Sequence, residues 1–119
     1  MIKEIAFTAY PCRNVESTRR WYEETLGLAF AGPYIEDGIE KYNEAHIANG
    51  CFSLMSDEWL DGAAGTGIGL TFEVDDLEAT LAALENQGIK ATGFFDGPVC
   101  KQSTVRDPEG NRIALHQRK

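Results

Sequence analysis

Cysteine, histidine and basic residues are all scarce in this chain of 119 residues. The three cysteines, Cys12, Cys51 and Cys100, are widely spaced, and the only histidines are His46 and His116. An odd number of separated thiols, with no Cys-x-x-Cys pair, excludes a disulfide framework and a zinc knuckle and is typical of a reducing cytosol. We therefore expect a cytoplasmic protein.

The sequence also lacks a long apolar run, so it predicts neither a signal peptide nor a membrane span. Its 11 basic residues are outnumbered by 19 acidic ones, which gives a net charge of −8. Nucleic acids and anionic membrane surfaces attract basic patches, so both are excluded as expected partners. An acidic surface suits a cationic ligand, although it serves solubility equally well. The length and the 43% hydrophobic content indicate one globular domain.

What is present is a repeated pattern of predicted elements. Residues 2–10 alternate as a strand before Pro11, and residues 15–26 have helical spacing between an N-cap at Asn14 and a stop at Gly27. Three more strands are predicted at 28–35, 40–48 and 51–56, with Asp37-Gly38 and Asn49-Gly50 as hairpin turns.

The second half begins the same order again. A strand is predicted at 68–74, a helix after a cap at Asp75 or Asp76, and strands at 89–95, 99–106 and 112–117. Residues 14–18 match residues 76–80 at an offset of 76 − 14 = 62, and Phe52 matches Ile113 at 113 − 52 = 61. A repeated unit that cannot bury its own apolar face implies two copies packed together.

Two motifs sit on this repeat. One is the tight turn Asp107-Pro108-Glu109-Gly110-Asn111, followed by an alternating strand, and the other is Trp21-Tyr22-Glu23-Glu24-Thr25-Leu26-Gly27 at the end of the first helix. Together they resemble the vicinal oxygen chelate superfamily of glyoxalases, bleomycin-resistance proteins and extradiol dioxygenases. The resemblance implies an α+β fold of two βαβββ modules (1–57 and 67–119, joined by a connector at 58–66) forming a curved mixed sheet around one cavity.

In metal-dependent members of that superfamily, four strand positions, usually His or Glu, hold a divalent ion. The resemblance places these positions at Phe7, Ser53, Gly69 and Ala114. Only the serine has a donor atom, and a neutral hydroxyl is a poor ligand where a catalytic metal needs about three protein donors. We therefore expect no metal site. The alternative is a divalent metal held by displaced ligands, namely His46, His116 and Glu73.

No other catalytic motif is present: the sequence has no Gly-x-Ser-x-Gly, no P-loop and no strand-to-helix Gly-x-Gly-x-x-Gly. The three cysteines have no neighbouring base, which disfavours a nucleophilic role. Whether the protein is an enzyme stays open, although Phe7, Ser53, Gly69 and Ala114 at the family's metal positions favour a binding protein.

An apolar cavity lined by small, aromatic and a few polar groups remains, which is the usual description of a small-molecule site. The predicted ligand-binding residues are Phe7, Ala9, His46, Ser53, Met55, Trp59, Gly69, Thr71, Glu73, Ala114 and His116.

The resemblance to the bleomycin-resistance branch implies metal-free binding of a small organic molecule, sequestering a cationic or aromatic compound. Two alternatives stay open: a metal-dependent lyase, isomerase or dioxygenase, and a non-catalytic interaction scaffold whose cavity is filled by side chains. Short members of the superfamily commonly pair, so a homodimer is expected.

Overall fold

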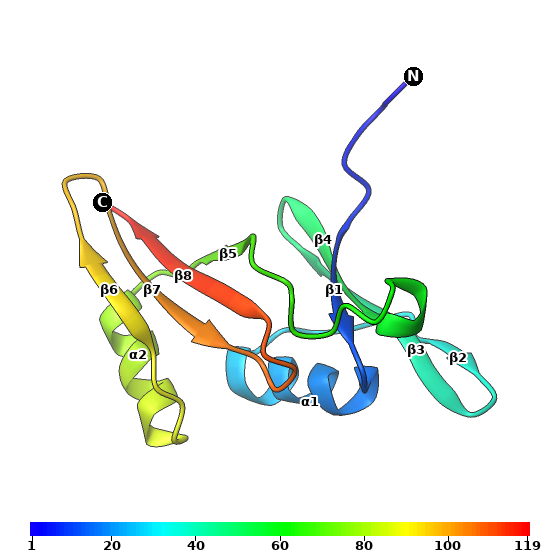
Figure 1. The fold of residues 1–119 in the computed structure, drawn as a ribbon. Coiled ribbons are helices and arrows are strands. Elements are labelled where there is room, and N and C mark those ends of the chain that lie inside the picture. The colour runs from blue at the N-terminus through cyan, green and yellow to red at the C-terminus, as the bar shows by residue number, and fades with distance from the viewer.

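The computed structural model describes all 119 residues and contains the two predicted βαβββ modules in sequence order (Figure 1). The first module comprises β1 (Thr8–Cys12), α1 (Val15–Leu26), β2 (Tyr34–Glu36), β3 (Ile39–Ile47) and β4 (Gly50–Ser56), followed by the short 3-10 helix η1 (Asp57–Trp59). The second comprises β5 (Leu70–Glu73), α2 (Leu77–Asn86), β6 (Thr92–Asp96), β7 (Cys100–Arg106) and β8 (Arg112–Arg118). The α+β class is confirmed.

Each module forms its own four-stranded mixed sheet, in the orders β1-β4-β3-β2 and β5-β8-β7-β6. The edge strands β1 and β5 do not pair, so the two sheets meet through side chains instead of forming one continuous sheet. In both modules the first strand pairs in parallel with the last, and the register repeats: Thr8 lies opposite Phe52, and Leu70 lies opposite Ile113. The structural offsets, 70 − 8 = 62 and 113 − 52 = 61, are those of the sequence repeat.

Both helices begin and end where their capping residues predict. The side chain of Asn14 accepts a hydrogen bond from the Ser17 amide at 2.9 Å, and Asp76 accepts one from the Ala79 amide at 3.0 Å. Gly27 ends α1 in the left-handed conformation at φ 72°. The helices lie on the same side of the molecule in Figure 1. Neither is long and apolar enough to cross a membrane.

Four strand predictions were too long: those at 2–10 and 28–35 by six residues each, and those at 68–74 and 89–95 by three residues each. Residues 2–7 and 28–33 belong to no strand, because alternation supplies a strand with a buried face but not with the neighbouring strand that must accept its hydrogen bonds. Pro11, expected to end the first strand, lies inside β1. Proline is tolerated there because β1 is an edge strand, so the amide hydrogen that Pro11 lacks is not needed to bond a second neighbouring strand.

One of the two predicted hairpin turns is confirmed, and the other was placed one residue too late. Asp37 and Gly38 turn between the paired residues Glu36 and Ile39, at φ 52° and 76°, as predicted. The second turn lies one residue earlier than predicted, because Ile47 pairs with Gly50 and leaves residues 48 and 49 as the loop.

The turn at residues 107–111 ties the two modules together. Buried Asp107 accepts hydrogen bonds from the Tyr22 hydroxyl at 2.7 Å and from the Asn111 side chain at 3.0 Å. The carboxylate of Glu109 accepts hydrogen bonds from the backbone amides of Arg13 and Asn14, each at 3.0 Å. These amides lie at the beginning of α1, where a negative charge complements the helix dipole. The C-terminal motif of the second module therefore positions the helix of the first.

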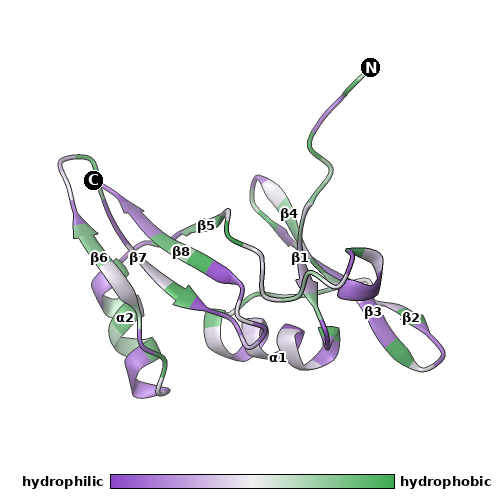
Figure 2. Ribbon diagram, viewed as in Figure 1, coloured by the Kyte–Doolittle hydropathy of each residue, from purple (hydrophilic) through white to green (hydrophobic).

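The core lies between the helices and the faces of the sheets that they cover. Tyr10, Phe52 and Leu54 from the first sheet join Ile113 and Leu115 from the second in one buried cluster. The rings of Phe52 and Phe72 meet edge to face at 5.7 Å, which connects the sheets. Figure 2 shows β8 hydrophobic in its middle and hydrophilic toward both ends.

Candidate functional site

The face of the first sheet that α1 leaves uncovered, here called the open face, carries aromatic and polar side chains. Its rows are fixed by register: Tyr42 lies opposite Met55, and His46 lies opposite Cys51. Between these rows, Ser53 has Ala9 on one side and Glu44 on the other. The rings of Phe7 and Tyr42 pack edge to face at 5.9 Å. This face therefore combines an aromatic wall with a carboxylate.

A cavity of about 450 Å³ opens at one end of this face. It is bounded by Ile5, Phe7 and Thr8, by residues 47–52 of the β3–β4 hairpin, and by residues 70–73 of β5, so it lies between the two sheets. Eight of its 13 lining residues are hydrophobic, and its volume falls within the range of about 300–1,000 Å³ that is usual for small-molecule sites.

On the second sheet, the predicted site residues form a compact group. Thr71 lies opposite Ala114, and Glu73 lies opposite His116. The Nδ1 atom of His116 is 2.6 Å from a carboxylate oxygen of Glu73. A hydrogen bond from the backbone amide of Arg118, and then the one with His116, lower the pKa of Glu73. Both carboxylate oxygens of Glu73 therefore already have hydrogen-bond partners within the protein.

Only three of the predicted ligand-binding residues line the cavity, and the others lie beside it or away from it. Phe7, Thr71 and Glu73 line the cavity. Ser53 and Ala114 are buried in the sheets next to it, while Gly69 is exposed in open space, where a methyl group in place of its hydrogen would meet no atom within 4 Å. Trp59 lies farther along the chain in η1, with its ring 5.8 Å from that of Tyr34.

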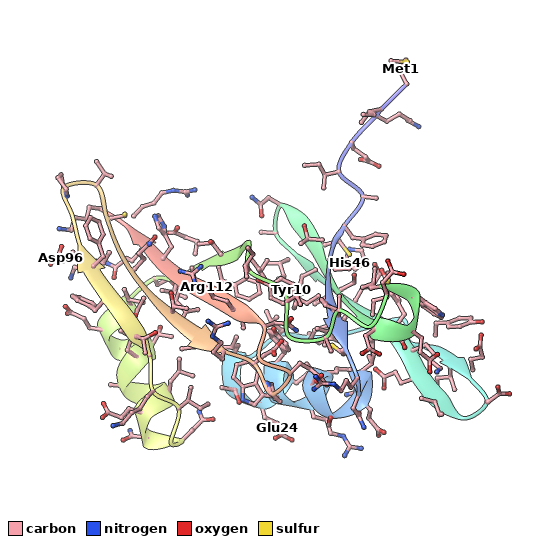
Figure 3. The ribbon with its side chains drawn as sticks, viewed as in Figure 1. Met1, Tyr10, Glu24, His46, Asp96 and Arg112 are labelled. Atoms are coloured by element: carbon pink, nitrogen blue, oxygen red, sulfur yellow. The ribbon has the colours of Figure 1, made fainter.

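His46 does not join Glu73 and His116. It is a neighbour of Glu44 and Cys51, and these three form the one group of at least three metal-ligating side chains whose donor atoms all lie within 4.8 Å of one another. Figure 3 shows His46 on the side of the molecule that carries β3 and β4. The metal alternative through His46, His116 and Glu73 is therefore not supported by the geometry.

The four metal positions implied by the resemblance do not fit a divalent ion. Phe7, Gly69 and Ala114 have no donor atom, and the Ser53 hydroxyl is fully buried against the backbone oxygen of Thr8 at 3.5 Å. A site of this composition offers fewer ligands than any structural or catalytic metal site requires.

Three open-face residues were not among those predicted for the site: Tyr42, Glu44 and Cys51. Glu44 Oε2 accepts hydrogen bonds from the Cys51 thiol at 2.9 Å and from the Tyr42 hydroxyl at 3.3 Å. Burial, then the bond to Glu44, raises the pKa of Cys51 to about 11. Burial also raises the pKa of Tyr42. The actual hairpin register places Cys51 across from His46 and diagonal to Glu44. The turn predicted at Asn49-Gly50 would have paired Cys51 with Ala48, so the sequence prediction did not bring these residues together.

Comparison with known proteins places most of the chain in one family. Residues 4–115 match the family model described as the Glyoxalase/Bleomycin resistance protein/Dioxygenase superfamily. A comparison with curated proteins finds no match.

Solved structures of the same architecture are numerous. The antibiotic-binding protein TnmS3 from Streptomyces sp. CB03234 is 24% identical, with a TM-score of 0.81 over 99% of this chain and 98% of its own. A glyoxalase/bleomycin resistance protein from the same organism is 25% identical, with a TM-score of 0.77 over 96% of this chain and 100% of its own. A lactoylglutathione lyase from Agrobacterium tumefaciens is 18% identical, with a TM-score of 0.78 over 98% of this chain and 95% of its own. Because both binding proteins and an enzyme share this architecture, the fold alone does not select a function.

Proposed function

This chain belongs to the glyoxalase/bleomycin resistance protein/dioxygenase superfamily, and on that premise we propose that it binds a small organic molecule without a metal ion. The ligand is a cationic or aromatic compound, which the protein sequesters without converting it. The observation that carries the proposal is the largely apolar cavity of about 450 Å³ between the sheets, with Phe7 on its wall.

The composition of the family's metal positions supports binding over catalysis. Phe7, Ser53, Gly69 and Ala114 offer a single neutral hydroxyl, so Lewis-acid chemistry at these positions has no protein ligands to support it. The likeness to TnmS3, an antibiotic-binding protein, agrees with this proposal at the level of the fold. The volume of the cavity argues against the scaffold alternative, because side chains do not fill it.

We also propose that two copies of the chain form a homodimer. The open cavity and the exposed apolar residues of the N-terminal segment, including Ile2 at 94% and Ile5 at 88% exposure, favour a homodimer that covers them. Ile5 also lines the cavity, so pairing there would help to close the site.

The test is a titration with N-methylacridinium, a planar aromatic cation, monitored by tryptophan fluorescence. Trp59 lies against Tyr34, which pairs with Tyr42 of the open face, whereas Trp21 packs against Tyr22 in α1 at 5.0 Å. We expect saturable quenching that Trp59→Phe removes and Trp21→Phe retains. After incubation, the probe should be recovered chemically unchanged.

Absence of saturable binding, checked by equilibrium dialysis, contradicts the binding proposal. Conversion of the probe contradicts sequestration. Quenching that depends on Trp21 and not on Trp59 places the ligand away from the open face.

A further inference from the structure

Glu44 differs from every other half-buried glutamate. Four glutamates are in this class: Glu23, Glu40, Glu44 and Glu109. Glu23 and Glu40 pair with Arg19 at 2.7 and 2.9 Å, and Glu109 pairs with Arg13 at 3.9 Å. Glu44, with 29% of its side chain exposed, has no lysine or arginine partner.

The contacts that Glu44 does make leave one side of its carboxylate free. Both of its hydrogen bonds, from the Cys51 thiol and the Tyr42 hydroxyl, reach Oε2. The Nε2 atom of His46 lies 3.7 Å from the same oxygen, and its side chain is 73% exposed. No hydrogen bond within the chain reaches Oε1. A partly desolvated carboxylate with only neutral donors gains more from a cation than an exposed one does, because water screens it less.

Two aromatic side chains, Tyr42 and Phe7, lie on the same face as this carboxylate. Tyr42 donates to it and packs against Phe7, which is 43% exposed and lines the cavity. Cys51, its other donor, also lines the cavity. A positively charged nitrogen beside Glu44 that also lay over the face of the Tyr42 or Phe7 ring would gain cation–π attraction.

We infer that Glu44 selects the charge of the ligand: it pairs with a cationic nitrogen of an aromatic compound whose rings lie against Phe7 and Tyr42. This inference rests on the proposed binding function and assigns its specificity to one side chain. Glu73 is the acidic residue that lines the cavity itself, whereas Glu44 adjoins the cavity through Cys51. Glu73 does not serve this purpose, since His116 and the Arg118 amide already occupy its two oxygens.

The experiment uses two probes of the same ring system, cationic N-methylacridinium and neutral N-methylacridone, on the full-length protein. In Glu44→Gln, we expect the affinity for the cation to fall about tenfold or more, as for loss of a charge-assisted contact, and the affinity for the neutral probe to stay within twofold. Glu85→Gln, on the exposed surface of α2, is the matched control, because it removes the same charge elsewhere. Thermal melts establish that each variant is folded.

A charge-reversal variant gives an independent readout. Glu44→Lys should bind the cation more weakly than Glu44→Gln does, while the neutral probe again changes little. If Glu44→Gln instead weakens both probes equally, or if Glu85→Gln has the same effect, the inference is overturned and the binding function stands. If the wild-type protein binds neither probe, both fall together. Stoichiometric zinc retained by the wild type and lost in Cys51→Ser would assign Glu44 to a metal site with His46 and Cys51, and would also overturn the inference.

Discussion

The phenolic oxygen of Tyr10, in β1 of the first module, accepts a hydrogen bond from the backbone amide of Leu70, in β5 of the second, at 2.9 Å. The same hydroxyl donates to the backbone oxygen of Arg112 at the beginning of β8. Tyr10 and Arg112 lie next to each other between the two sheets in Figure 3. The edge strands β1 and β5 make no backbone hydrogen bonds with each other. The buried Tyr10 hydroxyl instead joins the two modules through its bonds with Leu70 and Arg112.

Removal of this hydroxyl should destabilise the fold. Tyr10→Phe leaves the Leu70 amide and the Arg112 carbonyl without their shared partner in a region where Tyr10 is 3% exposed. We expect a loss of about 1–3 kcal/mol in the free energy of unfolding, measured by urea denaturation. The matched control is Tyr34→Phe, whose hydroxyl bonds Glu36 on the exposed surface and should cost no more than about 0.5 kcal/mol. Equal losses in the two variants would contradict the role of Tyr10.

The thiol of Cys51 should react slowly with iodoacetamide. Because its pKa is raised from 9.0 to about 11, the thiolate fraction at pH 8 falls on the order of a hundredfold. The rate of modification, followed by peptide mass spectrometry, should continue to rise up to about pH 11. Glu44→Gln should accelerate it several-fold at pH 8, because the carboxylate no longer holds the thiol proton. An unchanged rate would mean that the two groups do not interact.

The raised pKa of Cys51 also makes the stability of the protein fall as the pH rises above about 9. The folded state retains the Cys51 proton to higher pH than the unfolded chain does, so its contribution to stability is complete below pH 9 and is lost as the pH rises toward about 11. Cys51→Ser should therefore flatten the pH dependence of the melting temperature in this window. A steeper dependence in the variant would contradict the shift.

Purified protein should contain no stoichiometric transition metal and should gain none on dialysis against zinc, nickel or manganese. The family positions lack ligands, and at Glu44, His46 and Cys51 a metal would have to displace a thiol proton that is held to about pH 11. Atomic absorption after dialysis measures the metal content. One tightly bound ion per chain, abolished by His46→Ala or His116→Ala, would favour the metal-dependent alternative.

The protein should form a dimer of twice its chain mass of 13.1 kDa, as measured by light scattering at tens of micromolar. The N-terminal segment projects from the body in Figure 1, with Ile2 exposed to solvent. Ile2→Asp should weaken the association because it places a charge in the proposed interface, whereas Ile2→Val should preserve it. A monomeric mass for the wild type at this concentration would contradict the prediction.

The sequence alone determined the modular architecture, because the evidence for it is local. The caps at Asn14 and Asp76 satisfy amides within their own helices, and the Asp37-Gly38 turn adopts φ values that few residue pairs allow. The sequence offsets of 62 and 61 residues between matching positions of the two modules are the same in the strand registers, because each module repeats the same apolar alternation.

Only the tertiary structure decided which strands and which charges have partners. Alternation predicted a strand at residues 2–7, but a strand exists only where a neighbour accepts its hydrogen bonds, and none does. In the same way, Glu40 and Glu44 lie four residues apart on β3 and look alike in sequence. Glu40 meets Arg19 from α1, while Glu44 lies on the face that the helix leaves open, beside the cavity. Whether a charge is neutralised depends on what packs against it from distant parts of the chain, and periodicity does not contain that information.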